Sequence, residues 1–369
     1  MRRRSLWCLA CLLLLPALCI EAPPKLCAVG DLHGDMDHAL EALQLCGAVD
    51  GSWKWTGGTM TVVQTGDVLD RGHASLPLLQ ALWALRDEAA AAGGELLLLL
   101  GNHELLNLQG ATYYVDKHEL HAYGKAAWKK AMDPNSGELG QRLVTHPGAA
   151  VRGSGACRTL FLHAGLRHGT AAAHGSLDQL NAQLRAQVQT GAGPLLDAQD
   201  GPLWFRGYAR PHASGLSDEQ ACAEADAALR KLGDGATRMV LGHNIVPFVS
   251  SRCEGRVQLI DVGMSGAYGG RPAVWSCSAD GEGGVANAGK AAVRALYREG
   301  EEEPPPLCDA CASLRRTPGG GAQTLRGGDP HNDCLNYCRE PQPSGLSRFF
   351  GGGVPELSGS GANHAKVEF

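Results

Sequence analysis

The chain has 369 residues, of which 44% are apolar, and its formal net charge is −5. This length fits one large domain or two ordinary ones, and the apolar content is enough for a folded core. The acidic balance excludes the basic surface that attracts nucleic acids or anionic membranes.

A secretory signal peptide is predicted at residues 1–22. Three arginines at positions 2 to 4 precede an apolar run from Leu6 to Ile20, an order typical of such signals. The run is short for a spanning helix, so we expect no stable membrane span unless the signal stays uncleaved. The expected location is the secretory pathway, in the lumen of the endoplasmic reticulum or outside the cell. An uncleaved anchor, or a targeting peptide for another organelle, is the alternative.

Five apolar stretches are predicted strands, and polar residues follow each of them at once. In open α/β sheets, ligands bind at the carboxyl ends of the strands, so these polar residues are expected to meet at one edge. A single Asp or His after a strand is more often a turn former or a helix cap, but five such segments in order favour a shared site. The segments are 30–34, 66–72, 101–104, 163–165 and 243–244.

The side chains in these segments are typical of a metal site. They offer oxygen and nitrogen ligands without a thiolate, which suits a pair of ions such as Mn, Fe or Zn. An aspartate can bridge two ions, and Asp67 is the central candidate. The alternative is a set of core or capping residues without a metal. The candidate ligands are Asp31, His33, Asp67, Asn102, His163 and His243.

Predicted helices alternate with the strands, which favours an α/β fold packed in layers over an all-β domain. Ser217 and Gln220 resemble a capping box that opens a helix ending near Leu232, where Gly233 supplies a stop. Other helices are expected where apolar residues recur three and four positions apart. These ranges are about 35–43, 76–92 and 177–188.

The pattern loosens between Glu104 and about Val151, where several Tyr, Lys and His residues occur. An insertion near a site can shape a substrate surface. The alternative is a peripheral helical pair that packs by its aromatic residues. Beyond it, residues 257–260 and 273–275 are expected to be strands that complete the sheets.

The last segment, residues 301–369, is rich in proline and glycine. Such a composition cannot bury enough apolar surface to order the chain by packing alone, so we expect a tail beyond a domain at 25–300. Two cysteine pairs in the tail are predicted to form disulfides behind a signal peptide, with a zinc site as the alternative. They are Cys308, Cys311, Cys334 and Cys338.

Ten of the thirteen cysteines lie beyond the signal region. Their pairing cannot be deduced from the sequence. Cys27, on a predicted core strand, is interpreted as a small buried hydrophobic residue.

Three motifs carry a family resemblance. GDLHG at 30–34, GDVLDRG at 66–72 and GNHE at 101–104 resemble the signature motifs of the PPP-type calcineurin-like metallophosphoesterases. Most eukaryotic members have His-Gly-Gly where this chain has HAG at 163–165. With NHELLNL at 102–108, WFRGY at 204–208 and IDVGMS at 260–265, the chain resembles the Shewanella-like protein phosphatases over roughly residues 25 to 300. The resemblance implies a layered αββα metallophosphoesterase sandwich.

The resemblance also implies a role for each candidate. Asp31 and His33 would bind one metal, Asp67 would bind both, and the second metal would take Asn102, His163 and His243. Arg71 and Arg206 would hold the phosphate, because a guanidinium can bind it bidentately.

His103 follows a ligand and is expected at the rim of the site. With Asp70 on its other nitrogen, it would be an imidazolium that protonates the leaving oxygen.

Each role has an alternative. Asp70 and Arg71 would otherwise form a structural ion pair, and Arg206 would be a surface arginine. Residues 261–265 either line the site or form a turn that needs Gly263.

Three functions compete. The first is a metal-dependent phosphoprotein phosphatase that hydrolyses phosphomonoesters by attack of a hydroxide bound to two metals, with phosphoserine, phosphothreonine or phosphotyrosine as substrate. The second is a small-molecule phosphohydrolase such as a dinucleoside polyphosphatase, because such enzymes share the motifs. The third is a non-catalytic binding module on a decayed phosphoesterase frame, but decay would be expected to remove Asp70 and His103 first, and both are present.

Overall fold

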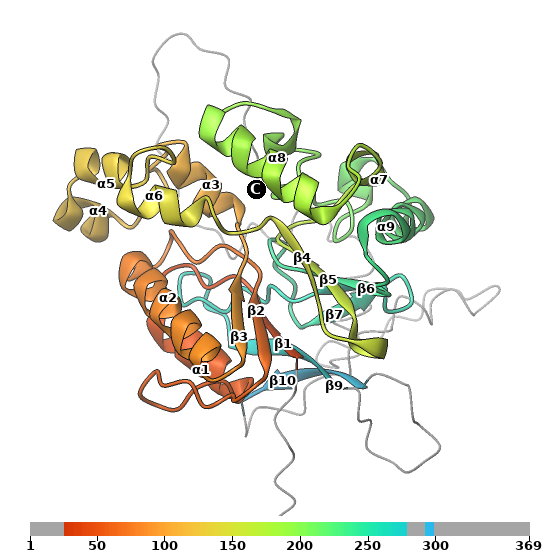
Figure 1. Ribbon diagram of the computed structural model, residues 1–369, viewed down its shortest axis with the longest axis horizontal. Helices are drawn as coiled ribbons and strands as arrows, with labels where there is room; N and C mark the ends of the chain where they lie inside the picture. The colour runs from red at the N-terminus through yellow and green to blue at the C-terminus, as the bar shows by residue number, and fades with distance from the viewer. Residues whose placement is uncertain (1–25, 279–291, 299–369) are drawn as a thin grey trace, which may run out of the picture.

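The computed structural model describes residues 26–278 and 292–298 (Figure 1). The predicted signal peptide at 1–22 and the tail at 301–369, with its four cysteines, lie outside the described residues. In the described part of the chain, no helix has the length and apolarity needed to cross a membrane.

Two five-stranded sheets form the centre of the domain. The first has the order β10-β9-β1-β2-β3, in which β1, β2 and β3 are parallel, β9 is antiparallel to β1, and β10 is antiparallel to β9. Its strands are β1 (Leu26–Val29), β2 (Thr61–Gln64), β3 (Glu95–Leu98), β9 (Ala273–Ser278) and β10 (Ala292–Tyr297).

The second sheet has the order β4-β5-β6-β8-β7. Its three central strands are parallel, and the edge strands β4 and β7 are antiparallel to their neighbours. Its strands are β4 (Ala149–Arg152), β5 (Thr159–Leu162), β6 (Arg238–Leu241), β7 (Ser250–Arg252) and β8 (Val257–Leu259).

The sheets pack face to face because alternate side chains of each strand point to opposite faces. Leu26 and Ala28 of β1 share one buried cluster with Phe161 of β5 and Trp275 of β9, whereas Cys27 belongs to the cluster that contains the helices. The rings of Phe161 and Trp275 meet edge to face with centroids 5.8 Å apart. Strands buried on both faces read as nearly continuous apolar runs, as β1 and β5 do.

Helices cover the outer faces, so the layers run helix, sheet, sheet, helix. In Figure 1, α1 and α2 lie beside the first sheet, and α7, α8 and α9 lie beside the second. The predicted αββα sandwich is therefore confirmed. The covering helices are α1 (Met36–Leu45), α2 (Ser75–Ala91), α7 (His168–Ala172), α8 (Leu177–Thr190) and α9 (Asp218–Leu232).

The helix ends follow local capping rules. Ser217 Oγ accepts the N–H of Gln220 at 3.2 Å, and the Gln220 side chain accepts the N–H of Ser217 at 2.7 Å, as the predicted capping box requires. The Asp35 carboxylate caps α1 by accepting the N–H of His38 at 3.0 Å. The predicted helices are thus confirmed to within a few residues.

Four further helices, α3 to α6, lie between β3 and β4. Trp128 of α5 is buried, and its ring meets that of Tyr123 at 5.6 Å, so these helices pack partly by their aromatic residues. The four are α3 (Asn102–Leu108), α4 (Lys117–Tyr123), α5 (Lys125–Ala131) and α6 (Glu138–Leu143).

Three disulfides link elements of the described chain. Cys157–Cys277 joins the segment just before β5 to β9 and so connects the two sheets. Cys27–Cys46 joins β1 to the end of α1, which corrects the interpretation of Cys27 as a free hydrophobic residue. The sequence could not show this pairing, because Cys46 follows α1 and reaches Cys27 only when that helix packs against β1.

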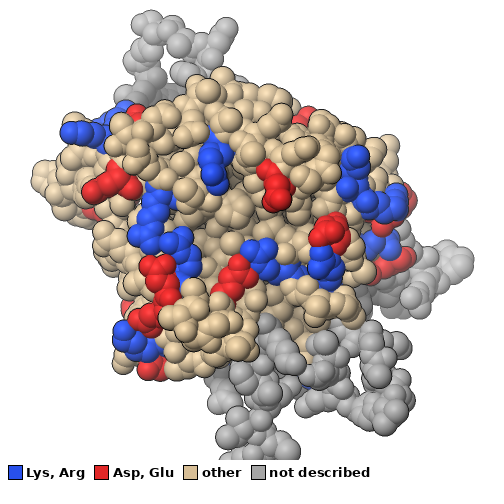
Figure 2. Space-filling view, viewed as in Figure 1, with Lys and Arg blue, Asp and Glu red and all other residues tan. Residues whose placement is uncertain are grey.

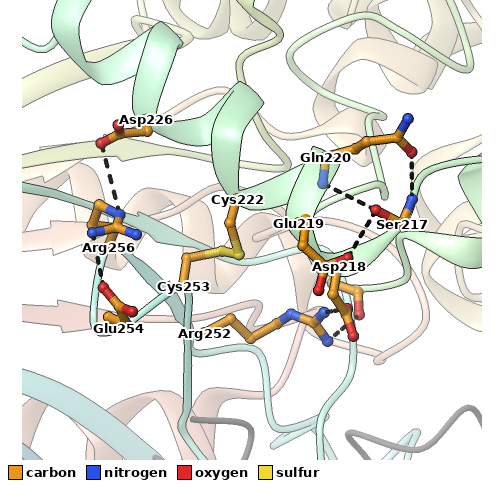
Figure 3. Close-up of a disulfide and its surroundings, with 11 residues drawn as sticks. Ser217, Asp218, Glu219, Gln220, Cys222, Asp226, Arg252, Cys253, Glu254 and Arg256 are labelled. Carbon is orange, nitrogen blue, oxygen red and sulfur yellow. Dashed lines mark hydrogen bonds and ion pairs between the residues drawn. A yellow bond between two sulfur atoms is a disulfide. The ribbon is translucent and has the colours of Figure 1, made fainter. Parts of the chain in front are cut away.

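The third disulfide, Cys222–Cys253, joins α9 to the turn after β7 (Figure 3). Ion pairs flank it on both sides. Arg252 pairs with Asp218, and Arg256 lies 3.7 Å from Asp226. The face drawn in Figure 2 shows Lys and Arg interspersed with Asp and Glu, so it carries no basic patch of the kind that binds nucleic acid.

Candidate metal centre and active site

The polar segments that follow the strands meet at one edge of the two sheets. The backbone N–H groups of Leu32 and His33, after β1, both donate to the carbonyl of Asp67 after β2 at 2.9 Å. The N–H of His243, after β6, donates to the carboxylate of Asp31 at 3.1 Å. The two sheets therefore contribute to a single site.

The backbone at this site is strained. Nine non-glycine residues of the described chain have a positive φ, and five of these belong to the predicted site. Such conformations cost about 1–3 kcal/mol each and cluster at functional sites. The five are His33 (φ 45°), Asp67 (φ 58°), Asp70 (φ 72°), Arg71 (φ 70°) and His243 (φ 65°).

Two groups of side chains in the described part of the chain could each hold a metal ion. His33, Asp67 and His103 form one, and Asp67, His163 and His243 form the other, with their ligand atoms within 4.8 Å of one another. Asp67 is common to both groups. This is the position expected of a bridging carboxylate.

Each of the three predicted histidine ligands is oriented by a backbone carbonyl. His33 Nδ1 donates to Leu69 at 3.1 Å, and His163 Nδ1 donates to Thr65 at 2.9 Å. His243 instead uses Nε2, which donates to Trp204 at 3.1 Å. A carbonyl can only accept, so this nitrogen carries the proton, and the other nitrogen of a neutral ring offers its lone pair to the site.

The donor atoms fit a cation. His163 Nε2 lies 2.8 Å from Asn102 Oδ1 and 3.4 Å from Asp67 Oδ1, so its lone pair faces two oxygens with no proton between them. Burial is the largest cause that lowers the pKa of His33 to about 3 and that of His243 well below its usual value. Neutral imidazoles and oxygen donors are ligands of the kind that divalent metal ions take in proteins.

Burial and neighbouring carboxylates oppose ionisation of two aspartates at the centre. In the protein alone, burial, Asp261 and Asp67 raise the pKa of Asp31 well above its usual range. Burial also raises the pKa of Asp261, to about 6. A bound cation would reverse these shifts by favouring the charged form.

All six predicted metal ligands are buried in this site. Asn102 is not a member of the second group but contacts it, with Oδ1 2.8 Å from His163 Nε2. Asp31 belongs to neither group of three, and His103 stands beside His33 and Asp67 instead. The six are Asp31, His33, Asp67, Asn102, His163 and His243, and none exposes more than 7% of its surface.

His103 and Asp70 form a tight pair. His103 Nδ1 lies 2.7 Å from Asp70 Oδ2, and His103 Nε2 is left facing the site, 4.0 Å from Asp67 Oδ2. Burial lowers the pKa of His103, but Asp67 and Asp70 outweigh it, so the net shift is upward.

The expectation that His103 lies at the rim is wrong, because it is only 5% exposed. Its backbone N–H donates to Asp67 Oδ1 at 2.9 Å, and the rings of His33 and Tyr114 cover it.

The two predicted phosphate-binding arginines are held by different contacts. The Arg71 guanidinium lies 3.9 Å from the centroid of the Tyr114 ring, which fixes it by a cation–π contact. Arg206 donates from Nη1 to the carbonyl of His243 at 3.2 Å and to Asn244 Oδ1 at 3.1 Å. Arg206 is therefore held beside the second group of ligands and is not a free surface arginine.

Glu104 organises the loop that carries Asp67, a role that the sequence did not indicate. Its carboxylate accepts four backbone N–H groups, those of Gly101, Asp67, Val68 and Leu69, at 2.7 to 3.0 Å. Burial and Asp67 nevertheless raise the pKa of Glu104 to about 7. Glu104 ends the GNHE motif at 101–104, but the motif alone did not indicate which groups its carboxylate would bind.

The segment after β8 lines the site and also forms a turn. Asp261 is 2% exposed and accepts the N–H of Gly263 at 2.9 Å, where Gly263 has a φ of 60°. Ser265 Oγ donates to the carbonyl of His33 at 3.4 Å. Both readings of this segment are therefore compatible with the geometry.

Comparisons with known proteins identify the family. The model of the calcineurin-like phosphoesterase family matches residues 24–247. Shewanella-like protein phosphatase 2 of Arabidopsis thaliana is 31% identical over 306 residues, covering 69% of this chain and 75% of that protein. An uncharacterised protein of Schizosaccharomyces pombe is 34% identical over 270 residues, covering 69% of this chain and 77% of that protein.

Among solved structures, the cold-active protein-tyrosine phosphatase of a psychrophilic Shewanella species is similar. It has a TM-score of 0.58 and 25% identity, and the match covers 73% of this chain and 79% of that one. The chain belongs to the calcineurin-like phosphoesterases and, among them, to the Shewanella-like protein phosphatases.

Proposed function

We propose that the protein is a phosphoprotein phosphatase that depends on two metal ions. The observation that carries the proposal is that the Asp67 carboxylate approaches both His33 and His163, with the Asp70–His103 pair beside it. Two bound ions of Mn, Fe or Zn would supply a hydroxide near neutral pH and neutralise charge on the phosphoryl oxygens. The relatives named protein phosphatases support a phosphorylated protein or peptide as the substrate.

The side chains around the centre have separate tasks in this proposal. Arg71 and Arg206 hold the phosphoryl oxygens through charge-assisted hydrogen bonds. His103 Nε2 gives a proton to the leaving oxygen, and Asp70 holds the opposite nitrogen so that Nε2 points into the site.

We further propose that the protein works in an oxidising compartment reached by the predicted signal at residues 1–22. The disulfides Cys27–Cys46, Cys157–Cys277 and Cys222–Cys253 support this, because disulfides persist mainly in such compartments. Thiol counting on protein isolated under alkylating conditions tests it. Free thiols at these six positions would contradict the proposal.

A substrate panel tests the function. Protein loaded with metal is given phosphoserine, phosphothreonine and phosphotyrosine peptides and, in parallel, dinucleoside polyphosphates. We expect kcat/KM to be highest for one of the phosphopeptides. Preference for the dinucleoside polyphosphates would replace the proposal by a small-molecule phosphohydrolase. Absence of turnover on all of them, with two metals bound, would indicate a binding module.

A further inference from the structure

Asn107 contacts the Asp70–His103 pair from one helical turn further along α3. Its Nδ2 donates to Asp70 Oδ1 at 2.9 Å and to the carbonyl of His103 at 2.9 Å. The residue is 1% exposed. Because Asp70 Oδ2 bonds His103, both oxygens of the carboxylate are occupied, and its plane is fixed.

Trp128 determines which way the Asn107 amide points. The indole Nε1 of Trp128 donates to Asn107 Oδ1 at 2.7 Å, and Trp128 is 1% exposed. An indole can only donate and a carboxylate can only accept. A flipped amide would therefore place its NH₂ against the Trp128 N–H and its oxygen against Asp70. Both contacts are repulsive in a buried site, so the network allows a single orientation.

We infer that Asn107, held by Trp128, positions the Asp70–His103 pair for proton delivery to the leaving group. Three hydrogen bonds of 2.7, 2.9 and 2.7 Å run from Trp128 through Asn107 and Asp70 to His103. These bonds connect α5, which lies in the segment between Glu104 and Val151, to the proposed proton donor. Asn107 and Trp128 are positioning residues, since they act through Asp70. The inference rests on the proposed role of His103.

A purely structural network would behave differently. Loss of a buried hydrogen bond would lower the melting temperature, but the folded protein would keep its preference among substrates. A positioning role affects the step in which the leaving oxygen takes its proton. The loss of rate in a variant that lacks this role should therefore depend on how much the leaving group needs that proton.

The test compares Trp128→Phe and Asn107→Leu with the control Trp83→Phe. Trp83 is also buried, and its Nε1 donates to His146 Nε2 at 3.0 Å. Trp128→Phe keeps an aromatic ring and removes only the N–H, so it carries the test if Asn107→Leu fails to fold. Each variant is assayed on phenyl phosphate, whose leaving group has a pKa of about 10 like tyrosine, and on p-nitrophenyl phosphate, whose leaving group is more acidic. Bound metal and melting temperature are measured on the same samples.

We expect Trp128→Phe and Asn107→Leu to keep their metals and their KM. Their kcat on phenyl phosphate should fall about 10- to 100-fold, the range found for residues that hydrogen-bond to the ligands of a metal site, and much less on p-nitrophenyl phosphate. Trp83→Phe should lower the melting temperature but leave kcat on both substrates and the bound metal unchanged. Equal losses on the two substrates, or a loss of metal in Trp128→Phe, would overturn the inference.

His103→Ala serves as the reference that separates the two proposals. If it loses rate equally on both substrates, the proton-donor role in the proposed function fails. If it loses more on phenyl phosphate while Trp128→Phe and Asn107→Leu do not, the proposed function stands and the positioning role is wrong.

Discussion

The carboxylate of Glu104 accepts the backbone N–H of Asp67 at 2.7 Å, and three further N–H groups bind the same carboxylate. Glu104 lies in the first turn of α3, directly after Asn102 and His103. One side chain thus joins the start of this helix to the loop that carries Asp67. The loop has a left-handed backbone at Asp67. Glu104 accepts the N–H groups of Asp67 and of the two residues that follow it.

Glu104→Gln should therefore lower both stability and metal binding. The amide has one acceptor oxygen, so about two of the four N–H groups would face its NH₂. An unsatisfied buried donor costs about 1–3 kcal/mol, and we expect a loss of about 3 kcal/mol in the free energy of unfolding. Denaturant unfolding and elemental analysis measure the two effects. Asp133→Asn is the control, because Asp133 accepts N–H groups in a turn away from the site. Full metal content in Glu104→Gln would contradict the role.

The three disulfides should differ in what they contribute to stability. Their sequence separations are 19, 31 and 120 residues. In the chain-entropy model a longer loop gives more stabilisation, about 3 kcal/mol for Cys27–Cys46 and about 5 kcal/mol for Cys157–Cys277. Replacing each pair by alanines and measuring denaturant unfolding tests this order. A larger loss for Cys27–Cys46 would show that local packing outweighs loop closure.

His146 should make the protein sensitive to acid. Burial, Arg86 and Arg142 lower its pKa to about 3, whereas the unfolded chain takes up a proton near pH 6.5. The unfolded state therefore binds more protons between these values, and stability falls as the pH falls. From pH 7 to pH 5 the loss is about 2 kcal/mol.

His146→Gln, which keeps an acceptor for the Trp83 N–H, should remove this part of the pH dependence. Unfolding of both proteins at pH 7 and pH 5 provides the comparison. If the free energy of unfolding changes by the same amount between pH 7 and pH 5 in both proteins, His146 is not responsible for the pH dependence.

Much of the layered fold could be predicted because its strands are buried on both faces. Continuous apolar runs such as Thr159–Leu162 mark strands whatever surrounds them. The helix over Asp218–Leu232 was predicted because Ser217 and Gln220 form a local capping box. The disulfide partners could not be predicted, since Cys157 and Cys277 meet only when the two sheets stack.

The candidate site was predictable to the extent that its residues follow strands. Asp67 and His163 follow β2 and β5, which belong to different sheets, and the two residues come within 3.4 Å because the sheets stack. The tasks of Glu104, Asn107 and Trp128 depend on side-chain directions across long sequence separations, which no motif spacing encodes. The burial of His103 was missed for the same reason, because Tyr114 and His33 cover it only in the folded chain.

The central claim is that Asp67 holds two metal ions together, and the metal content of Asp67→Asn tests it most directly. Purified wild-type protein, Asp67→Asn and the surface control Asp234→Asn are loaded with manganese, iron or zinc. The number of metal ions per chain and the rate of p-nitrophenyl phosphate hydrolysis are then measured on the same samples. We expect about two ions per chain and activity in the wild type and in Asp234→Asn. Asp67→Asn should hold one ion or none and lose its activity. Two ions per chain in Asp67→Asn would contradict the account.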